Sequence, residues 1–190
     1  MIIQATEIPD VKLITPTRHT DDRGYFFENI HMHSLRKQGL TLTIAQENIS
    51  RSSQGTLRGL HYQLSPFEQG KLVQVTQGEV FDVAVDIRQG SPTYGQSVGR
   101  ILSEHNRSLL YIPPGFAHGF YVLSETADFL YKCSSYYNKQ SERTIRWDDK
   151  TIGINWPLVP NTTTLISEKD RNAPNLLEAE NNFIFTNKKK

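Results

Sequence analysis

The sequence has 190 residues, which is enough for one domain with a sizeable hydrophobic core. Lys and Arg number 21 against 20 Asp and Glu, so the net charge of +1 gives no reason to expect a polyanionic partner such as nucleic acid. The single cysteine, Cys133, excludes an intramolecular disulfide and fits a reducing compartment, and the sequence shows neither a signal-peptide pattern nor a membrane-spanning apolar run, so a cytoplasmic protein is expected.

The first third of the chain alternates short apolar segments with polar turns. It predicts a strand or extended arm over residues 1–20, a turn at 20–24, an aromatic strand at 25–30, a short helix at 34–39, and strands at 44–49 and 56–63 separated by a polar turn at 50–55.

The middle of the chain has the strongest β pattern. Residues 71–76 and 79–88 flank Gln77-Gly78, which predicts a β-hairpin whose second arm alternates apolar and polar side chains. Further strands are expected at 99–102, 109–112, 120–123 and 128–134, with short helical turns over 167–180. Many short strands predict an antiparallel sandwich or barrel, as one domain over 1–185 with a flexible tail at 186–190.

One segment carries groups suited to chemistry. The strand expected over residues 58–63 places His61 on one face with Gly59 and Gln63, and Lys71 begins the next strand on the same face as two valines. A lysine in such apolar surroundings suggests a concave sheet in which a base and a cation meet with little water. This pair suits proton abstraction beside a carbonyl, because the base removes the hydrogen while the cation stabilises the enolate oxygen.

Seven blocks of sequence share their order and spacing with one known family: Asp22-Arg23-Gly24, the segment 58–63, Gly70-Lys71-Leu72-Val73, the segment 78–88, the segment 112–120, Phe129-Leu130-Tyr131-Lys132-Cys133 and Ile145-Arg146-Trp147-Asp148-Asp149. Together they resemble the dTDP-4-dehydrorhamnose 3,5-epimerase family, from about Ile14 to Pro174. The resemblance implies an all-β, cupin-type double-stranded β-helix (jelly roll) with a few short peripheral helices. It also implies a homodimer that uses no metal and no organic cofactor.

The implied activity is that of an isomerase in dTDP-L-rhamnose biosynthesis, a route to cell-surface polysaccharide. It epimerises dTDP-4-dehydro-6-deoxy-D-glucose at C3 and C5 to dTDP-4-dehydro-L-rhamnose. A hydrogen next to the C4 ketone is acidic because the carbanion delocalises into an enolate. The enzyme therefore needs a base, a positive or hydrogen-donating group at the ketone oxygen, and an acid on the opposite face of the ring.

By resemblance, His61 is the base, Asp170 orients it, Lys71 stabilises the oxyanion and Tyr131 is the acid. From the residues alone, Asp170 would be interpreted as a helix cap or surface carboxylate, and Tyr131 as a packing residue on the strand face of Phe129. The alternative role for His61 is that of a core histidine with satisfied hydrogen bonds.

The resemblance also implies contacts to the nucleotide sugar. Arg23, Phe26 and Glu28 are expected to contact the nucleotide, with this N-terminal segment serving the partner subunit's site. The other expected contacts are Gln46, Glu47, Asn48, Arg58, His118, Tyr137, Glu142 and Lys169. Tyr137 would stack on thymine, and the cations would bind the pyrophosphate. Ile49 departs from the pattern, since many relatives carry histidine or another polar residue there.

Three alternatives stay open. A single-site epimerase of a related deoxysugar would share the fold and the base, and a non-catalytic nucleotide-sugar binding module would be expected to lack His61, Lys71 or Asp170. A metal-dependent cupin is suggested by the segment 113–118, which resembles the second metal-binding motif of cupins. Its first motif would need His-x-His, however, where this chain has His61-Tyr62-Gln63, and glutamine is a poor ligand for transition metals.

Overall fold

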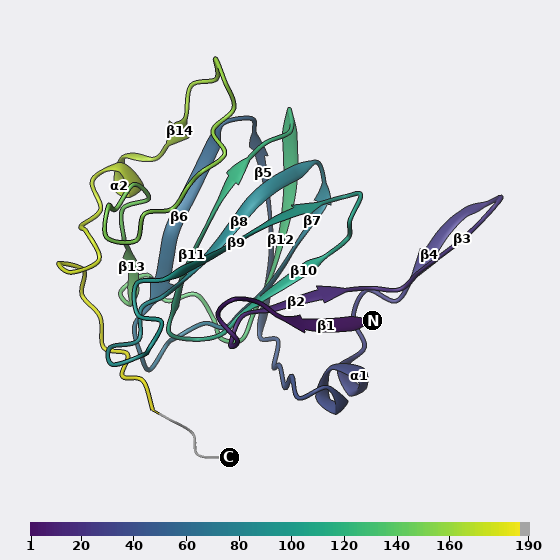
Figure 1. Cartoon of the computed structure of the whole chain (residues 1–190), viewed down its shortest axis with the longest axis horizontal. Coiled ribbons are helices and arrows are strands. Elements are labelled where there is room, and N and C mark those ends of the chain that lie inside the picture. Colours follow the sequence, from purple (N-terminus) through teal and green to yellow (C-terminus); the bar gives the residue numbers. More distant parts are fainter. Residues whose placement is uncertain (187–190) are drawn as a thin grey trace.

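The computed structural model describes residues 1–186, so the predicted tail, apart from Thr186, lies outside the described residues. Two facing sheets form the body of the molecule (Figure 1). The first sheet has the order β1 (Ile2–Ala5), β2 (Lys12–Thr15), β10 (Leu109–Ile112), β7 (Lys71–Gln77), β12 (Thr126–Cys133) and β5 (Gln46–Ser53). The second has the order β13 (Glu142–Thr144), β6 (Thr56–Gln63), β11 (Phe116–Val122), β8 (Glu79–Asp86) and β9 (Ser97–Ser103), with β14 (Leu165–Ile166) parallel to β6.

The remaining elements are peripheral. Strands β3 (Arg18–Asp21) and β4 (Gly24–Phe27) form a separate two-stranded sheet, a hairpin that projects away from the body (Figure 1). The two helices, α1 (Met32–Lys37) and α2 (Glu168–Arg171), are short. The two-sheet, mostly antiparallel arrangement confirms the predicted all-β jelly roll with a few short helices.

The hairpin predicted around Gln77-Gly78 is wrong. Strand β7 pairs with β10 and β12 in the first sheet, whereas β8 pairs with β11 and β9 in the second. The chain crosses between the sheets at Gly78, which has a φ of +77°, a conformation that favours glycine. Alternating side chains predicted both strands correctly, but they carry no information on whether the two strands bond to each other or face each other across a core.

Other predicted boundaries moved by a few residues. The turn predicted at 50–55 is confirmed only at 54–55, because β5 continues to Ser53, pairing with β12 along its whole length. The first helix begins at Met32 rather than at Ser34, since the imidazole of His31 accepts the N–H of Ser34 and caps the helix. The strands at 56–63 and 109–112 are confirmed at both ends. The short strands β13 and β14 were not predicted.

Three apolar layers hold the sheets together. The largest lies between them and includes Val73 and Val75 of β7, Phe129 of β12, Phe120 of β11 and Ala84 of β8. A second cluster covers the outer face of the second sheet, where side chains of the C-terminal third pack on Leu60 and Tyr62. A third lies under α1, on the outer face of the first sheet. Because both sheets are covered on their outer faces, apolar side chains occur on both faces of several strands.

Two glycines bring β6 and β11 unusually close together. A Cβ on Gly59 would lie 2.5 Å from the Cα of Gly119, and a Cβ on Gly119 would lie 2.7 Å from the carbonyl oxygen of Arg58. The pairing of the two strands shifts its register between His118 and Phe120, next to this contact. His61 and His118 are direct partners across the two strands, so the glycine contact sets the place of both imidazoles.

Candidate active site

His61 and Asp170 form a hydrogen-bonded pair. The Nε2 atom of His61 lies 2.7 Å from Oδ1 of Asp170, and the other carboxylate oxygen accepts the N–H of Gly59 at 3.2 Å. Burial by itself raises the pKa of Asp170, but the hydrogen bonds from His61 and Gly59 outweigh it and hold that pKa below its usual value. A carboxylate can only accept, so the proton of the neutral imidazole sits on Nε2 and Nδ1 keeps its lone pair.

Helix α2 positions Asp170 beside His61. The side chain of Ser167 accepts the N–H of Asp170 and caps the helix, and β14 just before it pairs with β6, the strand of His61. The carboxylate is 3% exposed and the imidazole 28% exposed, so the base reaches a cavity while its partner stays away from water. The two residues are 109 positions apart in the chain, yet the resemblance predicted the pair.

Lys71 comes from the opposite sheet, at the start of β7. Its Nζ lies 3.5 Å from the carbonyl oxygen of His61, which is its nearest hydrogen-bonding partner within residues 1–186. Burial lowers the pKa of the ammonium, while the charges of Cys133, Asp82 and Glu142 work in the other direction. The Lys71 ammonium has few protein partners in this dry site, so it can stabilise a negatively charged oxygen of a ligand.

Tyr131 lies on the same sheet face as Lys71, one strand away on β12. Its hydroxyl is 3.1 Å from the hydroxyl of Ser50 on β5. Burial raises the pKa of Tyr131 to about 12, so the phenol keeps its proton at neutral pH. The base and the phenol therefore approach one cavity from opposite sheets.

Two cavities meet at His61. The smaller, of about 140 Å³, is lined by His61, Lys71, Tyr131, Tyr137, Glu142 and Asn48, among others. The larger, of about 530 Å³, is lined on its other side by the cations Arg58, Lys169 and Arg171 and by several threonines. A sugar-sized space beside the base thus adjoins a wider, positively charged one.

The mouth of the smaller cavity is a chain of polar contacts. Glu142 accepts a hydrogen bond from the Tyr137 hydroxyl at 3.2 Å and forms an ion pair with Lys169 at 2.8 Å. The backbone N–H of Tyr137 donates to Gln46 at 2.9 Å, and Gln46 donates to Asn48 at 2.9 Å. Five predicted ligand contacts are therefore brought together at one rim.

Other predicted contacts lie in different places. Arg58 is exposed beside the larger cavity and donates to Ser52 at 3.2 Å, whereas His118 is buried and bonds to Asp82. Glu47 points to the opposite face of β5 from Asn48 and forms an ion pair with Lys132. The neighbouring Ile49 is 68% exposed on that same outer face, so it does not enter the cavity of its own chain.

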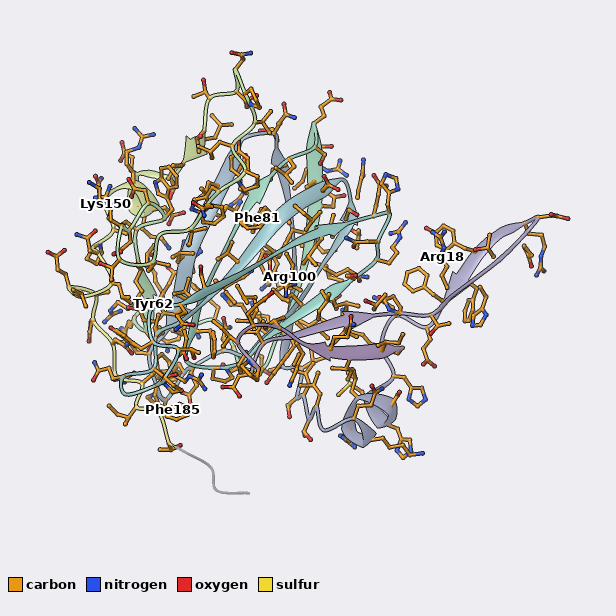
Figure 2. All side chains as sticks on the ribbon, in the orientation of Figure 1. Arg18, Tyr62, Phe81, Arg100, Lys150 and Phe185 are labelled. Atoms are coloured by element: carbon orange, nitrogen blue, oxygen red, sulfur yellow. The ribbon has the colours of Figure 1, made fainter. Side chains whose placement is uncertain are left out.

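The N-terminal contacts lie far from this site within one chain. Arg23 and Phe26 belong to the β3–β4 hairpin, which projects from the body (Figure 2). Arg23 forms an ion pair with Asp21 of the same hairpin, and Phe26 is 72% exposed. Glu28 follows β4, and its Oε2 lies 4.0 Å from Nε2 of His31. None of the three lines either cavity at His61.

Two polar groups near the site were missed by sequence reasoning. Ser50 was assigned to a turn, although it bonds to Tyr131 from a strand. Asp82 falls among the polar positions of an alternating strand, which suggests a solvent-facing carboxylate, yet it is 0% exposed. The side chains on the other face, including Phe81 and Val83, are apolar, as expected for a strand covered on one side or on both. They therefore gave no signal that Asp82 is buried.

In the part of the chain up to Thr186, no three His, Cys, Asp or Glu side chains are grouped so that they could hold a metal ion. No helix within the same residues has the length and apolar character needed to cross a bilayer.

The chain is similar to known enzymes over most of its length. The family model for dTDP-4-dehydrorhamnose 3,5-epimerase matches residues 5–178. A dTDP-4-dehydrorhamnose 3,5-epimerase of Shigella flexneri is 48% identical over 181 residues, which cover 95% of this chain and 98% of the relative. The crystal structure of a dTDP-6-deoxy-D-glucose-3,5-epimerase from Legionella pneumophila, in complex with dTDP-4-keto-L-rhamnose, is 50% identical and superposes with a TM-score of 0.88, covering 93% of each chain.

A more distant structure is a 3'-monoepimerase from Streptomyces bikiniensis in complex with dTDP-quinovose. It is 33% identical, with a TM-score of 0.84, and the match covers 91% of this chain and 87% of that one. The fold is thus shared by double and single epimerases, while the family model and the nearer relatives carry the name of the double epimerase. The chain belongs to the dTDP-4-dehydrorhamnose 3,5-epimerase family of isomerases.

Proposed function

We propose that this protein epimerises dTDP-4-dehydro-6-deoxy-D-glucose at both C3 and C5, giving dTDP-4-dehydro-L-rhamnose for dTDP-L-rhamnose biosynthesis. The observation that carries the proposal is the arrangement of His61 and Tyr131, which face one cavity from opposite sheets with Lys71 beside them. An inversion requires a proton to leave from one face of the ring and return to the other. A base and an acid on opposite walls meet that requirement.

The reaction can be assigned step by step. Nδ1 of His61 removes the proton next to the C4 ketone, while Asp170 holds the ring by its Nε2–H and stabilises the imidazolium that forms. The electron pair moves into an enolate, whose oxygen is stabilised by the Lys71 ammonium. The Tyr131 hydroxyl then donates a proton to the opposite face of the same carbon. The resulting tyrosinate takes up a proton from solvent, and the His61 imidazolium releases one to solvent. Repetition at the second carbon completes the double inversion.

The nucleotide would occupy the wider space beyond His61. Arg58 and Lys169 supply positive charge there for the pyrophosphate, and Tyr137 offers an exposed ring at the rim for thymine. Binding in this place changes the polar chain at the rim, because Lys169 and Tyr137 are both held by Glu142 in the free protein. The single unpaired thiol of Cys133 supports a cytoplasmic setting for the reaction.

Incubation with dTDP-4-dehydro-6-deoxy-D-glucose in deuterated water tests the proposal. We expect deuterium at both C3 and C5, measured by NMR and mass spectrometry of the recovered sugar, because both inversions pass through an enolate that is reprotonated from solvent. Label at one carbon only would replace the double epimerase with a single-site epimerase, the activity that the Streptomyces bikiniensis relative carries in its name. No exchange by folded protein that binds dTDP would favour a binding module.

We also propose a homodimer in which the β3–β4 hairpin completes the partner's site. Arg23 is 89% exposed and Phe26 is 72% exposed, and Figure 2 shows that the hairpin extends beyond the side chains of the body. An arginine and a phenylalanine so placed suit a phosphate and a base, but only in another subunit's cavity.

Mixing two defective variants tests this exchange of hairpins. Arg23→Ala combined with Phe26→Ala should weaken nucleotide binding, and His61→Ala should abolish exchange. Reassembled heterodimers should regain activity, since one of their two sites receives an intact hairpin and an intact His61. Light scattering should give twice the mass of the chain. A monomer, or a mixture as inactive as its components, would remove the hairpin from the site.

A further inference from the structure

One buried carboxylate oxygen beside the site lacks a partner among residues 1–186. Asp82, on β8, is 0% exposed, and its Oδ1 accepts the Nε2–H of the buried His118 at 2.7 Å. Its Oδ2 has no hydrogen-bonding partner in this described part of the chain. The surroundings are apolar, since the ring of Phe129 lies 5.9 Å from that of His118, and Ala84 belongs to the same core cluster.

A second carboxylate on the same strand shows how such a group is normally accommodated. Asp86 is also 0% exposed, but its Oδ2 accepts hydrogen bonds from Arg88, Ser91 and Thr93 at 2.6 to 2.7 Å. A carboxylate removed from water costs free energy unless cations or donors replace the lost hydration. Asp82 accepts one hydrogen bond, and its second oxygen accepts none from residues 1–186. A single hydrogen bond does not offset the cost of burying a carboxylate, so the stability of the fold does not explain why an aspartate lies here.

The positive charge that Asp82 can balance is Lys71. Within residues 1–186, Lys71 forms no ion pair of 4.0 Å or less, and its contact with the His61 carbonyl oxygen is long, at 3.5 Å. Cys133 on β12 is the direct cross-strand partner of Lys71. The charged groups whose fields act on the Lys71 ammonium are Asp82 on β8, Glu142 on β13 and Lys169 on α2. Glu142 is already engaged by Lys169 and by Tyr137, and Cys133 is a thiol whose pKa burial raises.

We propose that Asp82 is a positioning residue for the reaction: its free oxygen supplies the counter-charge that keeps Lys71 an ammonium in the dry cavity, and its other oxygen fixes the tautomer of His118. The inference rests on the proposed function and assigns Asp82 a task within the same site.

The second half of this role follows from the hydrogen bond to His118. Burial lowers the pKa of His118, more than the nearby Asp82 raises it, so the ring is neutral at pH 7. With its one proton donated from Nε2 to Asp82, the ring has an acceptor at Nδ1. The His118 ring, whose centroid lies 6.4 Å from that of Tyr131, therefore presents an acceptor and not a second donor to its surroundings.

Asp82→Asn tests the charge because the amide oxygen can still accept the His118 proton. We expect the alkaline limb of the kcat profile, where Lys71 loses its proton, to move about one pH unit lower. Acetylation of the Lys71 peptide, followed by mass spectrometry from pH 6 to 11, should show the same shift in its midpoint. Asp86→Asn is the matched control, a buried carboxylate on the same strand that does not face Lys71, and it should leave both midpoints in place.

The labelling measurement does not depend on catalysis. If the wild type performs no exchange, the proposed function fails, but the shift in Lys71 labelling still tests its coupling to Asp82. A uniform loss of activity in Asp82→Asn with an unchanged labelling midpoint would overturn the proposal and leave Asp82 a structural support of His118.

Lys71→Met provides a second variant if Asp82→Asn does not fold. Without the ammonium, the buried carboxylate of Asp82 loses its counter-charge, so its charged form becomes more costly in the folded protein. Folding is then favoured at low pH, where the carboxyl can take up a proton, and is weakened as the pH rises. The melting temperature of Lys71→Met, relative to the wild type, should therefore fall between pH 5 and pH 8. A constant difference between the two proteins over this range would contradict the coupling.

Discussion

His61→Ala should lower the rate of deuterium incorporation from solvent about 1,000-fold at both carbons, since a positioned general base typically contributes a factor of about 10²–10⁴. His61 lines the smaller cavity, and its Nδ1 keeps a lone pair because the Nε2–H is donated to Asp170. The loss applies to the first proton transfer, before any inversion, so neither exchange nor product should be seen. NMR of the sugar in deuterated water measures both.

Nucleotide binding should survive the same change. The groups proposed to bind dTDP, among them Arg58, Lys169 and Tyr137, lie beyond the base or at the rim, so calorimetry should give a dissociation constant for dTDP within about threefold of the wild type, a difference of less than about 1 kcal/mol. His105→Ala is a suitable control because His105 is an exposed turn residue that lines neither cavity. Added imidazole should restore part of the exchange in His61→Ala. Exchange at the wild-type rate would remove His61 from the mechanism.

The sequence predicted the base and the cation for a physical reason. A period of two places His61 and Lys71 on the inward faces of β6 and β7, and the apolar neighbours of Lys71 indicated a dry site. The alternation of side chains along a strand predicts which residues share a face, but it does not predict contacts with distant segments of the chain. Asp170 reaches His61 only because β14 and α2 return along β6, a contact between residues 109 positions apart that no periodicity encodes.

The missed features share one cause. Alternation of side chains along a strand does not show which strands it pairs with or whether each of its faces is buried or exposed to solvent. The residues around Gly78 look like a hairpin, although β7 and β8 belong to facing sheets. Asp82 looks like a solvent-facing residue, although both faces of β8 are covered. Tyr131 looks like a packing residue, and the resemblance to a family, not its pattern, gave it the role of acid. Two-sided burial in a jelly roll removes the contrast on which such predictions depend.

Tyr131→Phe should separate exchange from inversion. The change removes only the hydroxyl, so His61 can still form the enolate, and we expect deuterium to enter the recovered starting sugar. Product formation should fall about 100-fold, the lower end for loss of a positioned acid. The enolate would then be reprotonated by the His61 imidazolium, on the face from which the proton left. His61 is 28% exposed, so its proton can exchange with solvent and carry the label back without inversion.

The pKa of Tyr131 determines the pH range in which the Tyr131→Phe experiment can be interpreted. Burial raises it to about 12, so the hydroxyl stays protonated up to about pH 11, and a wild-type loss of activity between pH 8 and 10 has to come from another group. The Tyr131→Phe defect should thus be the same at pH 7 and pH 9.

Tyr136→Phe is the matched control, because Tyr136 is 72% exposed and outside the proposed site. It should behave as the wild type. An unchanged product yield in Tyr131→Phe would transfer the acid role to another group on the first sheet. Loss of exchange together with product would mean that Tyr131 also helps to form the enolate. Label returning to the starting sugar without inversion would place the base and the acid on opposite walls, which is what two sheets facing one cavity make possible.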